Sequence, residues 1–260
     1  MPPQTPQTRE QLVQQLVDGR HLFRLLDHYS CQFCGCPRQE KYHRGFSTCW
    51  GCEQNQRHYG DALSDLVPIT YTTKKWSLGT AIRDFKDVND ASASVPTALY
   101  FGALLSLWLD EHIDTVVPEP RVVTSVPSSR PVIASALERA ATEGWWVPDL
   151  VQVATRSPTA THQRTRREER WKVASDSWIV DSHAVAGLHV LVLDDICTSG
   201  GSLHSFARAL LDHGALSVTG VVMARNLGDN DGVWARPLLD AQHEAGQPWD
   251  FREIKHEVIA

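Results

Sequence analysis

The sequence lacks the features that mark membrane and exported proteins. In its 260 residues no apolar stretch approaches the roughly 18 residues that a membrane-spanning helix needs. Its first ten residues, MPPQTPQTRE, have neither the charged head nor the apolar core of a signal peptide. We therefore expect a cytoplasmic protein without a membrane span.

An excess of basic charge, internal repeats and long low-complexity tracts are also missing. The net charge of -6 gives the chain no overall attraction to nucleic acid. Its 12 histidines show neither a triad arrangement nor metal-ligand spacing, so we assign them no role. A hydrophobic content of 42% is enough for a packed core, and the length allows one large domain or two small ones.

What is present, unevenly, is cysteine: five of the six fall within 22 residues. They form two Cys-x-x-Cys pairs with 14 residues between them, which is the spacing of a zinc ribbon. The predicted ligands are Cys31, Cys34, Cys49 and Cys52. A disulfide or redox pair is the alternative, but a reducing cytoplasm argues against it.

The ligand set has two open points. Cys36 lies next but one to Cys34 and could offer its sulfur instead, and His43 could replace one ligand. Basic and aromatic residues near the cysteines could contact nucleic acid, although solvated charges and a packed aromatic explain them as well; they are Lys41, Arg44, Arg57, Tyr42 and Trp50.

The apolar pattern predicts two parts of the chain, residues 1–65 and residues 66–260. An amphipathic helix at about 8–28 and the cysteines make up the first part. The second part alternates helix and strand patterns, which predicts an α/β domain with a doubly wound, mostly parallel sheet. The predicted helices are 80–86, 94–109 with Pro96 in the first turn, 131–141 and 202–211, and the predicted strands are 121–126, 150–154, 189–193 and 218–223.

The most informative motif runs from Leu191 to Ser202: an apolar strand, the acids Asp194 and Asp195, and a Thr-Ser-Gly-Gly-Ser turn that opens a helix. The helix N-terminus, the turn hydroxyls and closely approaching glycine backbone make a cradle for phosphate. Carboxylates at the end of a buried strand can accept hydrogen bonds from sugar hydroxyls. The motif therefore predicts a site for ribose 5-phosphate.

This motif closely resembles the phosphoribosyl-diphosphate (PRPP) motif of type I phosphoribosyltransferases. The resemblance implies that Asp194 and Asp195 are the catalytic residues and bind the ribose hydroxyls, and that the loop binds the 5-phosphate through Thr198, Ser199, Gly200, Gly201 and Ser202. It also implies Mg²⁺ bound with PRPP, and transfer of a 5-phosphoribosyl group to an unknown acceptor with release of pyrophosphate.

The whole chain resembles the ComF-like, competence-associated phosphoribosyltransferases, which join a four-cysteine zinc knuckle to such a domain. The resemblance covers about residues 22–226 and includes the cysteine pairs, the PRPP motif and the segments Tyr71–Lys86, Val126–Pro127 and Met223–Arg225. It implies that the pyrophosphate binds a loop after an early strand, at Ser128, Ser129 and Arg130.

Two segments bear on function beyond the motif. ComF-like proteins usually continue from the pyrophosphate loop with a run of arginines, whereas this chain goes straight into Pro131-Val132-Ile133. The stretch 155–176 is the most basic of the chain; a lid over the sugar diphosphate, a solvated turn and a nucleic-acid contact are its three interpretations.

Two functions follow. The first is a PRPP-dependent phosphoribosyltransferase whose partner is PRPP or another ribose-5-phosphate ligand. The alternative, which the departure at Pro131 favours, is a non-catalytic PRPP- or nucleotide-binding regulator or a DNA-uptake factor of the ComF type, with nucleic acid or DNA-processing proteins as partners. The sequence leaves the oligomeric state open, a homodimer included.

Overall fold

The computed structural model describes residues 7–18, 22, 30–36, 47–72, 77–86, 91–127, 150–157 and 177–227. Its helices are α1 (Arg9–Asp18), α2 (Trp50–Tyr59), α3 (Ser77–Lys86), α4 (Ala91–Val116), α6 (Ser182–Val185) and α7 (Gly201–Asp212). Its strands are β1 (Asp65–Thr72), β2 (Arg121–Ser125), β3 (Ala154–Arg156), β4 (Trp178–Val180), β5 (His189–Cys197) and β6 (Ser217–Asn226).

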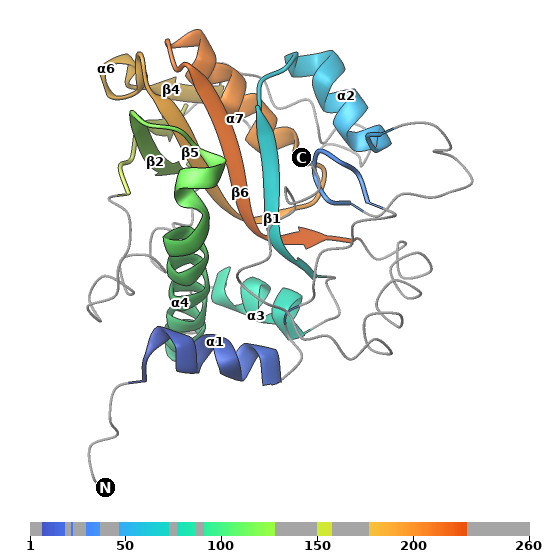
Figure 1. Ribbon diagram of the computed structural model, residues 1–260, viewed down its shortest axis with the longest axis vertical. Coiled ribbons are helices and arrows are strands. Elements are labelled where there is room, and N and C mark those ends of the chain that lie inside the picture. The colour runs from blue at the N-terminus through green and yellow to red at the C-terminus, as the bar shows by residue number, and fades with distance from the viewer. Residues whose placement is uncertain are drawn as a thin grey trace, which may run out of the picture.

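A four-stranded parallel sheet in the order β1-β6-β5-β2 forms the centre of the fold (Figure 1). Each neighbouring pair is parallel, with β5 paired to both β2 and β6. Parallel neighbours need crossover connections, which here place helices on both faces of the sheet. The predicted doubly wound α/β fold is confirmed.

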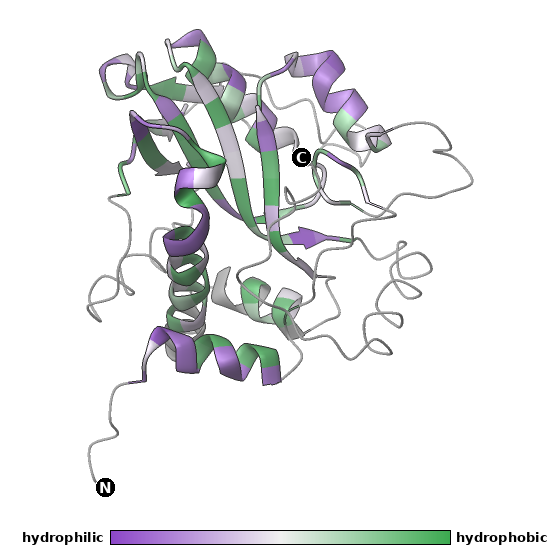
Figure 2. Cartoon of the chain, in the orientation of Figure 1, coloured by the Kyte–Doolittle hydropathy of each residue, from purple (hydrophilic) through white to green (hydrophobic). Residues whose placement is uncertain are grey.

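The two faces of the sheet carry separate hydrophobic clusters. On one face, α1, α3 and α4 pack over β5 and β6, and residues 101–109 of α4 are buried without interruption. On the other face, α7 packs over the same strands together with the cysteine-rich region. Figure 2 shows the sheet and α4 as mostly hydrophobic, whereas α2 is mostly hydrophilic. No helix in the described ranges is both long and apolar enough to span a membrane.

Close packing of α7 depends on Gly220 in β6. A Cβ atom at Gly220 would lie 2.7 Å from Leu203 Cδ2 and 3.2 Å from Leu66 Cδ1. At these distances the terminal methyl groups of Leu203 and Leu66 would have to shift to make room for a side chain. The absence of a side chain at Gly220 therefore allows the first turn of α7 to pack closely on the sheet.

Several sequence predictions need correction or stay untested. The long helix begins at Ala91 instead of residue 94, so Pro96 is its sixth residue. The proline lacks an N–H and removes one backbone hydrogen bond near the helix start. Burial of the apolar residues further along the helix stabilises it by more than this loss costs. The predicted strand 150–154 contributes only a bridge between Leu150 and Val123 to the parallel sheet, because the chain then turns into an antiparallel pair, β3 with β4.

The N-terminal helix is confirmed over Arg9–Asp18, with Leu12 and Leu16 buried. The remainder of the predicted helix, apart from Leu22, and the predicted helix 131–141 lie outside the described residues. The division into 1–65 and 66–260 stays a prediction. α1 packs on α4, and α2 packs on α7, so both N-terminal helices contact helices of the second part.

Candidate functional site

The candidate site lies where β5 ends and α7 begins. Strand β5 is central in the sheet, and its apolar residues 190–193 are fully buried, which fixes the strand end that follows them. Asp194 is half-buried and Asp195 is buried at this end. Asp194 Oδ1 accepts the N–H of Asp195 at 2.9 Å, and Asp195 Oδ1 accepts the N–H of Ile196 at 2.6 Å. These hydrogen bonds hold both carboxylates at the carboxyl edge of the sheet.

The loop from Thr198 to Gly200 connects the acids to α7. Gly200 adopts a left-handed backbone conformation with φ of +78°, which glycine reaches without the steric cost of other residues. A Cβ at Gly200 would lie 3.1 Å from Asn55 Nδ2, so the position is crowded as well. This turn delivers the chain directly into the first turn of α7.

The donors of this junction suit a phosphate. The N–H groups of Ser199 and Gly200 form no hydrogen bond within the described part of the chain. The first N–H groups of α7 lack intrahelical partners, as at every helix start, and they add the positive end of the helix dipole. Thr198, Ser199 and Ser202 supply hydroxyls, and all three have solvent-accessible surface.

The carbonyl groups of the same loop are bound by buried polar side chains. Asn55 of α2 donates to the carbonyl of Ser199 at 2.8 Å. Arg225 of β6 donates from one nitrogen to the carbonyls of Cys197, at 2.6 Å, and Thr198. Asn226 donates to the hydroxyl of Thr198 at 3.1 Å. The loop is therefore anchored from two other elements of the fold.

Of the predicted pyrophosphate loop, Ser128, Ser129 and Arg130 lie outside the described residues. The residues that lead into it are described: the N–H of Val126 donates to the carbonyl of Leu193 at 3.1 Å. The end of β2 therefore lies beside the end of β5, one residue before Asp194. Most of the basic stretch, residues 158–176, also lies outside the described ranges.

Arg156, at the start of that stretch, lies beside the chain that follows β2, and the sequence did not single it out. Its Nε donates to the carbonyl of Pro127 at 3.2 Å, and its guanidinium carbon lies 4.8 Å from the ring centroid of Trp178. Partial burial lowers the pKa of Arg156, and the nearby charge of Asp194 opposes that shift. Its position after the predicted strand 150–154, where the basic stretch begins, was the available signal.

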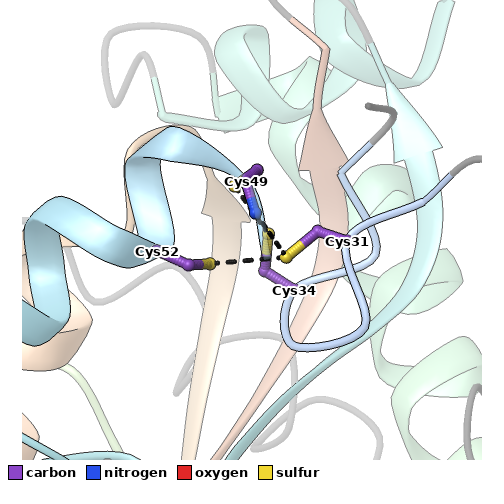
Figure 3. A group of neighbouring side chains, drawn as sticks. All are labelled: Cys31, Cys34, Cys49 and Cys52. Carbon is purple, nitrogen blue, oxygen red and sulfur yellow. Dashed lines mark hydrogen bonds between the residues drawn. The ribbon is translucent and has the colours of Figure 1, made fainter. Parts of the chain in front are cut away.

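The four predicted metal ligands come together in one buried cluster (Figure 3). The sulfurs of Cys31, Cys34, Cys49 and Cys52 all lie within 4.8 Å of one another, and the close-up shows Cys31 and Cys34 on a turn facing the start of α2. The Sγ atoms of Cys31 and Cys52 are 3.7 Å apart, as are those of Cys34 and Cys49. A tetrahedron with Zn–S bonds of about 2.3 Å has edges of about 3.8 Å, so the thiols fit zinc.

Contacts among the cysteines shift the pKa values of their thiols in both directions. All six cysteines are free, and the N–H of Cys49 donates to Cys31 Sγ at 3.2 Å. Hydrogen bonds from the other cysteines, first Cys31, hold the pKa of Cys34 well below that of an ordinary thiol. A hydrogen bond with Cys34 raises the pKa of Cys31, and one with Cys31 raises that of Cys52, so in the absence of a metal Cys34 is the thiol of the cluster that loses its proton most readily. Cys36 is partly exposed and lies outside the group of four. Cys197 is buried, and burial raises the pKa of its thiol to about 11, which suits the predicted role of a small core residue.

Comparison with known proteins agrees with the geometry of the junction. Residues 147–233 match the phosphoribosyl transferase domain, a match that includes β5, the loop and α7. This part of the chain is therefore similar to a phosphoribosyl transferase domain. No curated protein matches the chain significantly.

Two solved structures are similar to the chain at low sequence identity. The allosteric regulatory enzyme of purine biosynthesis is 18% identical with a TM-score of 0.35, over 50% of this chain and 26% of that one. The glutamine PRPP amidotransferase from B. subtilis, complexed with ADP and GMP, is 17% identical with a TM-score of 0.38, over 55% of this chain and 30% of that one. The chain thus spans less than a third of either protein.

Proposed function

We propose that the protein binds PRPP and transfers its 5-phosphoribosyl group to an acceptor, with release of pyrophosphate. The observation that carries this proposal is the junction of β5 and α7, where two acids are followed by a left-handed glycine turn and a helix N-terminus. Acceptors for sugar hydroxyls and donors for a phosphate are thus a few residues apart on a rigid strand–helix unit, as ribose 5-phosphate requires.

The phosphate is bound by the loop. The N–H groups of Ser199 and Gly200 and the first turn of α7 donate to its oxygens, and the hydroxyls of Thr198 and Ser202 complete the shell. Asp194 and Asp195 accept hydrogen bonds from the vicinal ribose hydroxyls. The sugar therefore spans the end of β5, with its anomeric carbon toward the end of β2.

The diphosphate extends toward the loop that follows Pro127. Ser128, Ser129 and Arg130 are its proposed ligands, since a guanidinium can bind phosphate oxygens in a bidentate manner. Arg156 supports this assignment because it adds a cation beside Pro127 and within the electrostatic reach of Asp194. Mg²⁺, when bound with PRPP, neutralises charge on the leaving diphosphate.

In the reaction the acceptor forms a bond to the anomeric carbon while the bond from that carbon to the pyrophosphate oxygen breaks. The electron pair of the broken bond leaves with pyrophosphate, and the acceptor loses its proton to solvent or to a base in the acceptor pocket. The protein contributes position and charge: the loop and acids hold the ribose, and the cations hold the leaving group.

The four-cysteine cluster is the proposed site of a structural Zn²⁺, held by Cys31, Cys34, Cys49 and Cys52. All four ligands are protein thiols, so the site is closed and has a structural role. We propose a cytoplasmic location, where a reducing environment keeps the thiols available for the metal.

The test is pyrophosphate release from PRPP with Mg²⁺ across purine, pyrimidine and amine acceptors, with PRPP binding measured by calorimetry in parallel. We expect binding and, with one acceptor class, turnover that Asp195→Asn reduces. Binding without turnover for any acceptor would favour the non-catalytic regulator or DNA-uptake factor of the ComF type. Absence of binding by the folded, zinc-loaded protein would refute the proposal.

A further inference from the structure

The phosphate loop and the four-cysteine cluster are joined by direct contacts. Asn55, which donates to the carbonyl of Ser199, lies on α2 three residues after the metal ligand Cys52. Gly200 also faces this side, since its Cβ position lies 3.1 Å from Asn55 Nδ2 and 3.6 Å from Cys197 Sγ. Thus α2 contacts both the metal ligands and the loop.

The position of α2 depends on few apolar contacts. Its buried residues are Cys52, Asn55 and Tyr59, which share one face at helical spacing, while its other side chains are mostly polar. Of these three, Tyr59 alone is a large apolar side chain, and its ring stacks on His204 of α7 at 6.4 Å. A metal bound by Cys49 and Cys52 would fix the first turn of α2, and Asn55 follows within the next turn.

Arg225 makes a second link between the cluster and the loop. Its guanidinium is buried and donates to the carbonyls of Cys197 and Thr198. Burial alone would lower the pKa of Arg225, but the surrounding cysteines, first Cys36, outweigh it and raise that pKa. The guanidinium therefore binds the backbone of the loop and lies within electrostatic reach of the cysteines.

These contacts determine which way the loop amides face. In a trans peptide the carbonyl of one residue and the N–H of the next point in opposite directions. Carbonyls 197, 198 and 199 are bound on the side of the cysteines by Arg225 and Asn55. The N–H groups of residues 198, 199 and 200 consequently face away from the cysteines, where three successive donors form an anion-binding concavity.

We infer that the four-cysteine site controls the phosphate loop: metal binding fixes α2 and the cysteine turn, and Asn55 and Arg225 transmit that order to the loop amides. Asn55 and Arg225 are positioning residues in this scheme. The inference rests on the proposed function, because it assigns a means of regulation to the same phosphate site. Loss of the metal would leave the acids in place on β5 and weaken the phosphate half of the site.

Linkage makes the inference measurable from both sides. If zinc raises the affinity for a sugar phosphate by some factor, the sugar phosphate must raise the affinity for zinc by the same factor. The probe is ribose 5-phosphate, which contains the groups the loop and acids would bind. Zinc affinity is measured by competition with a chromophoric chelator, without and with saturating ribose 5-phosphate, on the full-length protein. We expect an increase of at least about fivefold.

A variant separates transmission through Asn55 from simple stability. Asn55→Leu keeps the approximate shape of the side chain and removes the donor to the carbonyl of Ser199. We expect the affinity for ribose 5-phosphate to fall about tenfold. One zinc should still bind, but ribose 5-phosphate should raise the zinc affinity less than it does in the wild type. Gln56→Leu is the matched control, since Gln56 is exposed on the same helix and donates to Asp61 at 2.8 Å, away from the loop. The control should bind ribose 5-phosphate as the wild type does.

The outcomes are distinct. Ribose 5-phosphate binding that is unaffected by Asn55→Leu, together with an unchanged zinc affinity, would overturn the inference while leaving the proposed function intact. If neither ribose 5-phosphate nor PRPP binds the folded, zinc-loaded wild type, the proposed function fails and the inference fails with it. If Asn55→Leu and Gln56→Leu lower the affinity for ribose 5-phosphate equally, the effect comes from the stability of α2 and not from the contact of Asn55 with the loop. That result would also overturn the inference.

Discussion

Helices α1 and α2 both precede the sheet in the chain, yet they are attached to its opposite faces by different means. α1 places Leu12, Val13 and Leu16 in the cluster around α4, and Arg9 donates to Ser106 at 2.9 Å. α2 presents two small or polar buried residues, Cys52 and Asn55, and one aromatic ring. The first attachment is apolar burial, whereas the second consists of a hydrogen bond, one aromatic contact and, with the proposed zinc bound, thiol ligation.

The difference has a functional meaning. Apolar burial does not depend on metal concentration, so α1 stays attached as long as the domain is folded. In the proposed zinc site the thiols must lose protons and bind the metal, so the attachment of α2 would depend on the pH and on the metal concentration. Of the two helices, α2 contacts the loop from Thr198 to Gly200. The attachment that would vary with the proposed metal is therefore the one next to the candidate site.

The largest expected effect is loss of the metal. Replacing Cys52 by alanine should abolish binding of one zinc per chain and lower the free energy of unfolding by more than about 4 kcal/mol, because metal binding and folding are coupled. Metal analysis and denaturant unfolding measure both effects. Cys36→Ala, at the partly exposed cysteine outside the cluster, is the control and should retain zinc. The opposite ranking would mean that Cys36 is a ligand and Cys52 is not.

The next effect tests the other helix. Leu12→Ala removes buried apolar side chain from the α1–α4 contact and should lower the free energy of unfolding by about 2 to 4 kcal/mol. Zinc content and ribose 5-phosphate affinity should be unchanged, because α1 packs on the opposite face of the sheet from the cysteines. A loss of ligand affinity comparable to that of Asn55→Leu would remove the distinction between the two helices.

A third variant acts on the loop itself. Gly200→Leu forces a side chain into a left-handed conformation and against Asn55 and His204, so it should weaken ribose 5-phosphate binding by about ten- to a hundredfold, measured by calorimetry. Gly60→Leu is the matched control, since Gly60 has nearly the same φ, +66°, with no atom within 4 Å of its Cβ position. Unchanged binding by Gly200→Leu would place the phosphate elsewhere.

The sequence was most informative where the pattern is local. The strand 189–193, the acids, the glycine turn and the helix from Ser202 follow each other within about 25 residues, and the structure has β5 and α7 there with slightly longer bounds. The start of α4 and the course of the chain after Leu150 were predicted wrongly, because propensity at Pro96 and an apolar run at 150–154 were overruled by packing.

The contacts around the loop were not predictable in this way. Asn55 and Ser199 are 144 positions apart, and nothing in the composition of α2 distinguishes Asn55 from its polar neighbours. Arg225 was visible only as part of a resemblance, without a partner. Such contacts depend on how two helices and a strand end meet in three dimensions, and a single sequence contains no periodicity that reports them.

The smallest effect concerns His204, a residue of α7 whose ring faces the cysteine region. Its ring is 5.7 Å from that of Phe33 and is buried, and burial lowers the pKa of His204 to about 4 from an ordinary value of 6.5. The folded state therefore binds this proton less readily than the unfolded state, so stability is fully present above pH 6.5 and declines as the pH falls toward 4. Between pH 7.5 and 5.5 the free energy of unfolding should fall by about 1.3 kcal/mol.

His204→Phe, which keeps an aromatic ring, should remove this part of the pH dependence in denaturant unfolding, whereas His183→Phe, at an exposed position, should not. Both variants keep every cysteine, so the contribution of the metal cancels in the comparison. If the free energy of unfolding depends on pH in the same way in the wild type and in His204→Phe, the folded state does not exclude a proton from this histidine. Water would then reach the contact between α2 and α7.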